Sequence, residues 1–97
     1  IVDDIIDSGG TIVNAAKALR NRGAKEVYVY ITHGVLSGDA VRKIKNSLIK
    51  NLVITDTIDN SEKIKNAKNI EVLSISSLMG EAIKRISNST SVSDLFK

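Results

Sequence analysis

The sequence contains no cysteine among its 97 residues, so disulfides and thiolate metal sites are excluded and nothing indicates an oxidising compartment. Aromatic residues make up only 3%, which leaves no stacking platform for single-stranded nucleic acid. No apolar run approaches the roughly 20 residues that a membrane-spanning helix needs, and no signal peptide is present in these residues. These absences predict a cytoplasmic protein that binds neither nucleic acid nor a membrane.

The formal net charge of +3 is spread along the chain rather than gathered in one basic run. Its lysines are expected to form solvated faces: Lys43, Lys45, Lys50, Lys63, Lys65 and Lys68. The length suits one domain, residues 1–97, that buries about 60–70% of the surface of its unfolded chain. We interpret residues 89–97 as a tail that follows the last helix.

The chain opens on an apolar pair, Ile1 and Val2, without an initiator methionine. We expect these to be the last residues of a buried strand that delivers Asp3 and Asp4 at its carboxyl end. Ligands bind at that end in open α/β sheets, and the two carboxylates suit vicinal hydroxyls or a divalent cation. We therefore expect a piece of a longer protein whose sheet is incomplete at its N-terminal side.

A glycine-containing loop follows, with a hydroxyl on either side of Gly9 and Gly10. Glycines let backbone N–H groups approach an oxyanion closely, and the first turn of the next helix favours a phosphate there. Ser8 and Thr11 would add hydroxyl donors. A phosphate site beside a diol site predicts a phosphorylated sugar. The same residues also fit the metal-binding strand of a nucleotide hydrolase, a phospho-acceptor pocket or a simple strand-to-helix turn.

Hydrophobic spacing predicts alternating strands and helices. A helix from Thr11 should end at Gly23 in the left-handed conformation, and the strand Val27–Thr32 is apolar on both faces, as in a sheet covered by helices on each side. Ser37 is a candidate N-cap. Apolar residues should turn inward on the helix at Ile12, Ala15, Ala16 and Leu19, and on the next one at Ala40, Val41, Ile44 and Leu48.

The second half repeats the pattern with shorter elements. Strands are expected at Leu52–Thr55 and Ile70–Ile75, separated by a polar loop over 60–69. The last helix should begin near Ser76 and end at Asn88. Its core-facing side chains are expected to be Leu78, Met79, Ala82, Ile83 and Ile86.

Two polar residues near strand ends each have more than one possible role. His33, the only histidine, either contacts a phosphate or nucleotide at the rim of the sheet or hydrogen-bonds its own loop. Asp56 follows the strand ending at Thr55, and capping its own turn through its side chain is the favoured role.

Three strings and the tail resemble known sequences. Asp3 to Thr11 strongly resembles the phosphoribosyl-binding motif of the type I phosphoribosyltransferase fold, with Ser8 where threonine is more usual. Thr32 to Gly38 is similar to a segment of the ribose-phosphate pyrophosphokinase family, with Asp39 where that family commonly has proline. Thr55 to Ile58 is similar to its Thr-Asn-Thr-Ile, with Asp56 replacing asparagine. The tail Ser-Val-Ser-x-Leu-Phe resembles the family's carboxyl-terminal signature.

The resemblance implies the carboxyl-terminal part of a synthetase with an α/β, three-layer, parallel-sheet type I domain. It implies transfer of pyrophosphate from ATP to ribose 5-phosphate. Asp3 and Asp4 would hold the ribose 2- and 3-hydroxyls, directly or through Mg²⁺. The 5-phosphate would be wrapped by Asp7, Ser8, Gly9, Gly10 and Thr11. The ATP-clamping residues would lie upstream, so we expect this chain alone to be inactive.

By the same resemblance, a nucleotide or phosphate regulatory site between subunits would involve Ser91, Ser93 and Phe96. The protein would then be a homo-oligomer, a hexamer in the form of a closed ring of dimers. On residues alone, the tail is typical of a frayed end with one anchoring aromatic. Two other functions stay open: another type I phosphoribosyltransferase, which would consume phosphoribosyl pyrophosphate, and a non-catalytic regulatory subunit related to the synthetases.

Overall fold

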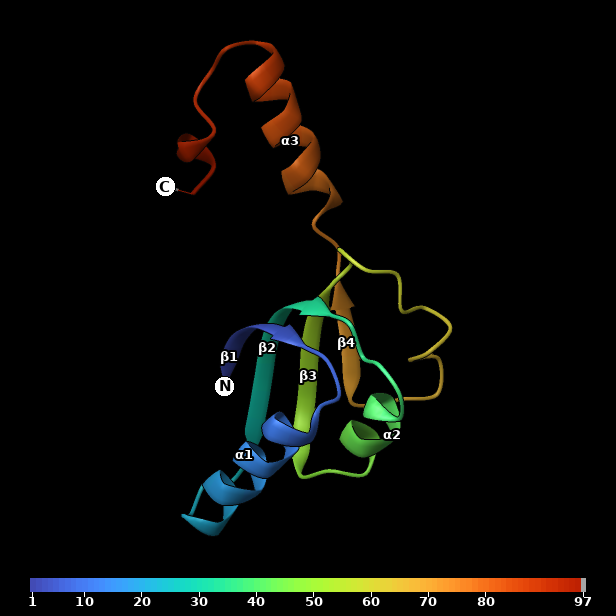
Figure 1. Cartoon of the computed structure of the whole chain (residues 1–97). Helices are drawn as coiled ribbons and strands as arrows, with labels where there is room; N and C mark the ends of the chain where they lie inside the picture. The colour runs from blue at the N-terminus through green and yellow to red at the C-terminus, as the bar shows by residue number, and fades with distance from the viewer. Residues whose placement is uncertain (97) are drawn as a thin grey trace.

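The computed structural model describes residues 1–96, which form an α/β structure around one parallel sheet (Figure 1). The sheet has four strands in the order β1-β2-β3-β4. Each strand therefore lies beside the strand that follows it in the chain. The strands are β1 (Val2–Ile6), β2 (Val27–Gly34), β3 (Ile49–Thr55) and β4 (Ile70–Leu73).

Two helices cover one face of this sheet, α1 (Gly10–Asn21) and α2 (Ala40–Lys45) (Figure 1). Right-handed crossovers that always step in the same direction put every connecting helix on the same side. The two helices bury Ile12 and Ala16, and Ala40 and Ile44, against the inward side chains of the strands. These strand residues include Val27, Val29, Ile31, Leu52 and Ile54. The core lies between the sheet and this single helical layer.

The opposite face of the sheet has no helix over it within residues 1–96. Along β2 the side chains alternate, with Val29 and Ile31 buried and Tyr28 and Tyr30 exposed. The expected cover on both faces, and hence the third layer, is therefore absent from the described chain. The apolar composition of β2 predicted cover on both faces, but composition does not say which segment would cover the second one.

The last helix, α3 (Ser76–Ser87), projects from the carboxyl edge of the sheet and is followed by the short 3₁₀ helix η1 (Ser93–Phe96) (Figure 1). None of its residues is buried, and Ile83 and Ile86 are 63% and 69% exposed. The prediction that its apolar stripe faces the core is wrong. The radius of gyration, 15.8 Å, exceeds the roughly 13 Å of a compact domain of this length because of this extension.

Several local predictions hold and others shift by a few residues. Gly23 ends α1 with φ of 104°, as expected for the left-handed cap. Leu19 and Leu48 are exposed rather than inward, and β3 already begins at Ile49. The residue before α2 is Asp39 rather than Ser37, and its side chain makes no capping hydrogen bond. Segment 60–69 is a loop of turns, as predicted.

No helix in the described part of the chain combines the length and the apolar character needed to cross a bilayer.

Candidate functional site

The loop between β1 and α1 consists of Asp7, Ser8 and Gly9. Gly9 has φ of 84°, a left-handed conformation that favours glycine, and its carbonyl accepts the first helical hydrogen bond from the Val13 N–H at 3.0 Å. Gly9 is also buried against α2, because a Cβ there would lie 3.7 Å from Ala40 Cβ and Ile44 Cδ1. Its backbone is thus set by both the turn and the packing.

No side chain among residues 1–96 caps the backbone N–H groups in the first turn of α1. That turn also contains no acidic residue. The unpaired N–H groups and the positive end of the helix dipole therefore face the loop, which is the arrangement that favours an anion. Ser8 and Thr11 are exposed on either side of the two glycines, and their hydroxyls can donate to the same anion.

A cavity of about 290 Å³ is formed by this loop and the strand before it. That volume is close to the lower end of the range for small-molecule pockets. Five of the seven predicted site residues line it, and Asp4 and Gly10 do not. The lining residues are Asp3, Ile5, Ile6, Asp7, Ser8, Gly9, Thr11 and Ile12.

We predicted that the two adjacent carboxylates lie at the end of the strand, but the structure places them inside it. β1 continues through Ile6, so Asp3 and Asp4 are consecutive strand residues whose side chains point to opposite faces. Asp3 lies on the same side as Ile5 and borders the cavity, while the Asp4 N–H donates to Asp3 Oδ1 at 2.8 Å. The structure therefore brings Asp3 to the loop and leaves Asp4 outside the lining.

The segment after β2 braces this loop from the side. The N–H groups of Val35 and Ser37 donate to the carbonyls of Ile6 at 2.9 Å and Asp7 at 3.1 Å. Leu36, between them, is 1% exposed and has a positive φ of 52°, which is uncommon for a bulky residue. These contacts fix the position of Asp7 relative to β2.

Residues that the sequence did not single out hold this brace in place. Asn60 is buried, and its Nδ2 donates to the Gly34 carbonyl at 2.7 Å. Lys63, expected to be solvated, donates from Nζ to the carbonyls of Val35 at 3.3 Å and Leu36 at 3.4 Å. A lone asparagine or lysine in a polar loop carries no periodic signal, so sequence patterns had no means of finding these roles.

His33 and Asp56 each connect neighbouring loops at the carboxyl edge. His33 Nδ1 is 2.8 Å from Thr57 Oγ1, so this histidine joins the ends of β2 and β3 rather than bonding within its own loop. Asp56 Oδ1 accepts from the Ile75 N–H at 2.9 Å. That bond, with help from Ser74, lowers the pKa of the Asp56 carboxyl below its ordinary value. The Asp56 side chain therefore bonds to the residue before α3 rather than capping its own turn as predicted.

The tail residues are not brought to the loop cavity. Ser91 Oγ and Ser93 Oγ are 2.9 Å apart, and Arg85 Nη1 donates to the Ser91 carbonyl at 3.0 Å. Phe96 is 71% exposed. Ser91, Ser93 and Phe96 lie beyond α3, and none of them lines the loop cavity.

Comparison with known proteins gives the family. The model of the phosphoribosyl synthetase-associated domain matches residues 1–97. The chain belongs to this family. This domain is 57% identical to ribose-phosphate pyrophosphokinase of Hyphomonas neptunium and 59% identical to that of Brucella melitensis, in each case over 99% of the chain and 31% of the relative. The chain thus spans about a third of these curated relatives.

A solved structure agrees in shape as well. Phosphoribosylpyrophosphate synthetase from Mycobacterium smegmatis superposes with a TM-score of 0.85 and 36% identity, over 91% of this chain and 29% of that one. The parallel sheet with its connecting helices is therefore shared with a member of the synthetase family. The resemblance noted in the sequence strings is confirmed at the level of the family.

Proposed function

We propose that this domain supplies the ribose 5-phosphate site of an enzyme that makes phosphoribosyl pyrophosphate. The observation that carries the proposal is the loop Asp7–Gly9, which opens an uncapped helix beside a carboxylate-lined cavity, in a chain of the phosphoribosyl synthetase-associated family. The domain is then of the phosphoribosyltransferase type I, and it corresponds to the carboxyl-terminal part of the synthetase.

In this proposal the first-turn amides and the hydroxyls of Ser8 and Thr11 hold the 5-phosphate. Gly9 allows the left-handed turn that aims the first-turn amides at the loop, and Gly10 keeps the space beside those amides free of a Cβ. Asp7 is held by its hydrogen bond from Ser37, so the loop is preorganised before the ligand arrives. Preorganised donors cost little reorganisation when a charged ligand binds.

Asp3 accepts hydrogen bonds from the ribose hydroxyls, since it borders the cavity on the side of Ile5. Mg²⁺ is bound in proteins by one or two carboxylates together with waters and substrate phosphates. No group of three or more candidate ligands gathers within residues 1–96. Asp3 and Asp4 do not fit as a joint pair of ligands, because consecutive strand residues point to opposite faces and only Asp3 borders the cavity. Asp3 would then supply a single carboxylate to the ion, and the ion would supply charge neutralisation on the transferred phosphates.

The reaction is the attack of the anomeric hydroxyl oxygen of ribose 5-phosphate on the β-phosphorus of ATP. The bond between that phosphorus and the α-phosphate oxygen breaks, AMP leaves, and the hydroxyl proton passes to solvent. Transfer of this kind depends on positioning and on charge stabilisation rather than on a covalent intermediate. This domain positions the acceptor sugar, and the groups that clamp ATP come from outside residues 1–97. The domain alone is then inactive, and the complete enzyme is a cytoplasmic homo-oligomer.

The test uses the natural gene product that contains this chain. Production of AMP and phosphoribosyl pyrophosphate is measured while ribose 5-phosphate and ATP are varied separately. Asp3→Asn should raise the KM for ribose 5-phosphate by about tenfold or more, with a smaller effect on the KM for ATP, because one charged hydrogen-bond acceptor is removed. The matched carboxyl-to-amide control is Glu62→Gln, an exposed residue away from the cavity.

Two results would overturn the proposal. The first is absence of phosphoribosyl pyrophosphate synthesis in the natural protein together with consumption of that compound in the presence of a free base, which would indicate a phosphoribosyltransferase. The second is absence of either activity while the protein alters a partner synthetase, which would indicate a regulatory subunit.

A further inference from the structure

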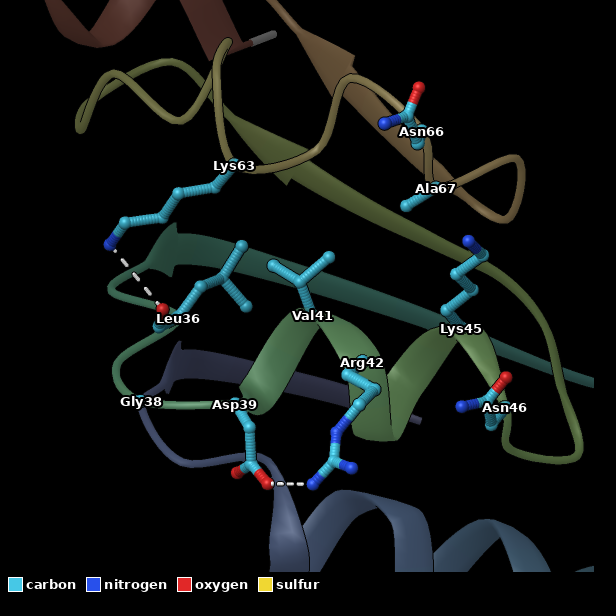
Figure 2. A pocket seen from close by; sticks show the side chains of 10 residues that line it. All are labelled: Leu36, Gly38, Asp39, Val41, Arg42, Lys45, Asn46, Lys63, Asn66 and Ala67. Carbon is cyan, nitrogen blue, oxygen red and sulfur yellow. Dashed lines mark hydrogen bonds and ion pairs between the residues drawn. The ribbon is translucent and has the colours of Figure 1, made fainter.

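A second cleft, of about 460 Å³, lies on the far side of α2 from the phosphate loop. It is bounded by α2 on one side and by the segment 60–67 on the other (Figure 2). None of its lining residues lines the loop cavity. Ala40 and Ile44 of α2 pack toward Gly9, while Val41 and Lys45 line the cleft, so the helix separates the two cavities.

The floor of the cleft is apolar. It is formed by Leu36, Val41 and Ala67, which come from three different segments (Figure 2). Leu36 and Ala67 are buried and Val41 is half-buried, so the floor is part of the packed structure. A ligand with a compact apolar group would bury that group against this floor, but the apolar side chains offer it no hydrogen bond.

The walls of the cleft carry positive charge at two separate places. Figure 2 shows Lys63 on the segment 60–67 and Lys45 on α2, on either side of Val41. Lys63 Nζ has three donors, and its two hydrogen bonds to backbone carbonyls, at 3.3 and 3.4 Å, leave one for a ligand. Lys45 is exposed and makes no ion pair among those described.

The third cation of the cleft is already neutralised. Arg42 pairs with Asp39, and the second oxygen of the same carboxylate is 3.5 Å from Lys43 Nζ. Asp39 is the only carboxylate among the lining residues that the structure describes. The cleft therefore retains a net positive charge that comes from Lys45 and Lys63. The side-chain amides of Asn46 and Asn66 add neutral donors and acceptors at its rim.

We propose that this cleft binds a small organic anion, a molecule that joins one phosphate or carboxylate group to a compact apolar body. The anionic group contacts Lys63 or Lys45, and the body lies on Leu36, Val41 and Ala67. Both halves of the ligand are needed, because exposed lysines alone give weak and salt-sensitive attraction. The proposal does not depend on the function assigned to the loop cavity.

The test is a methyl NMR titration of the natural gene product that contains this chain. Phenyl phosphate is the probe, benzoate replaces its headgroup, and inorganic phosphate and phenol each keep one half of it. Methyl signals of Leu36, Val41 and Ala67 report binding in the cleft. Val53, on the uncovered face of the sheet, is the methyl control.

The expected result is a saturable shift of the three cleft methyls with phenyl phosphate, and none at Val53. Inorganic phosphate and phenol should bind at least about tenfold more weakly, because each lacks one set of contacts. Benzoate separates the sources of the anionic group: comparable binding means that the cleft accepts a carboxylate as well as a phosphate, and much weaker binding means that it selects phosphate.

Charge variants complete the experiment. Lys45→Gln and Lys63→Gln should each weaken phenyl phosphate binding by about three- to tenfold, since both groups are exposed and partly screened. Lys65→Gln, on the same segment as Lys63 but outside the lining, should change it less than about twofold. The proposal is wrong if the cleft methyls do not shift, or if Lys65→Gln weakens binding as much as the other two variants.

Discussion

The carboxylate of Asp56 accepts a hydrogen bond from the backbone N–H of Ile75, with the Oδ1 and N atoms 2.9 Å apart. Asp56 follows β3 and Ile75 directly precedes α3, so this bond ties the end of a central strand to the start of the projecting helix. Because none of the residues of α3 is buried, polar contacts at its base help set the direction in which it leaves the sheet.

This bond makes the environment of Ile75 sensitive to pH. The folded-state pKa of Asp56 is lowered chiefly by the Ile75 N–H, so the stabilisation is complete above the unfolded-state pKa and is lost as the pH falls through the folded-state value. We expect the amide proton shift of Ile75 to titrate at a pH below the ordinary range of an aspartate carboxyl, because the Asp56 pKa is lowered. Asp56→Asn, which keeps an acceptor but does not ionise, should give a flat curve. A titrating Ile75 signal in that variant would contradict the assignment.

A second prediction concerns the close approach at Gly34. A Cβ added there would lie 2.7 Å from Ile54 Cδ1 and 3.3 Å from Ile54 Cγ2, inside the core. Gly34→Ala should therefore lower the free energy of unfolding by about 1–3 kcal/mol, measured by urea denaturation. The matched control is Gly80→Ala in α3, where nothing lies within 4 Å and alanine should stabilise the helix by up to ~1 kcal/mol. Equal effects of the two variants would argue against tight packing of Ile54 on Gly34.

A third prediction concerns the buried amide of Asn60. Asn60→Ala leaves the Gly34 carbonyl without its donor at 2.7 Å, and an unsatisfied buried acceptor costs about 1–3 kcal/mol. The measurement is the same denaturation experiment, with exposed Asn14→Ala on α1 as control, which should change stability by less than ~0.5 kcal/mol. A neutral Asn60→Ala would mean that the brace between β2 and the 60–69 loop does not depend on this residue.

A fourth prediction compares two isoleucines of equal size on different helices. Ile44 of α2 is fully buried, and Ile86 of α3 is 69% exposed. Ile44→Ala should cost about 2–5 kcal/mol of unfolding free energy, whereas Ile86→Ala should cost less than ~0.5 kcal/mol in the isolated chain. Similar costs for the two would show that α3 packs on the core after all.

Much of the architecture followed from local rules in the sequence. The turn at Gly9, the left-handed end of α1 at Gly23 and most of the inward positions of α1 and α2 depend on a few adjacent residues. Spacing and residue type are enough to predict such local features. The order of strand, glycine turn and helix start was predicted for the same reason, since these elements are consecutive in the chain.

Features that depend on partners distant in sequence could not be predicted in this way. The apolar stripe of α3 was correctly recognised, but its spacing could not say that Ile83 and Ile86 find nothing to cover them in residues 1–96. The end of β1 was placed too early because charged residues usually mark strand ends, whereas the edge position of this strand leaves Asp3 and Asp4 exposed to solvent. The cleft beside α2 combines three segments, and its lysines look like ordinary surface charge in the sequence.

The strand order has a consequence for how this chain acquires its structure. Every hydrogen-bonded strand pair joins segments that are consecutive in the chain, so no pairing has to wait for a distant segment to arrive. Closing a short loop costs less entropy than closing a long one, so pairing of consecutive strands lowers the barrier to folding. Parallel sheets that pair strands distant in sequence face a higher barrier. β2 and β3 are the strands with a neighbour on both sides, and both contribute fully buried residues. The sheet should therefore nucleate at this central pair and grow outward, and its amides should exchange with solvent in the reverse order, from β1 and β4 inward.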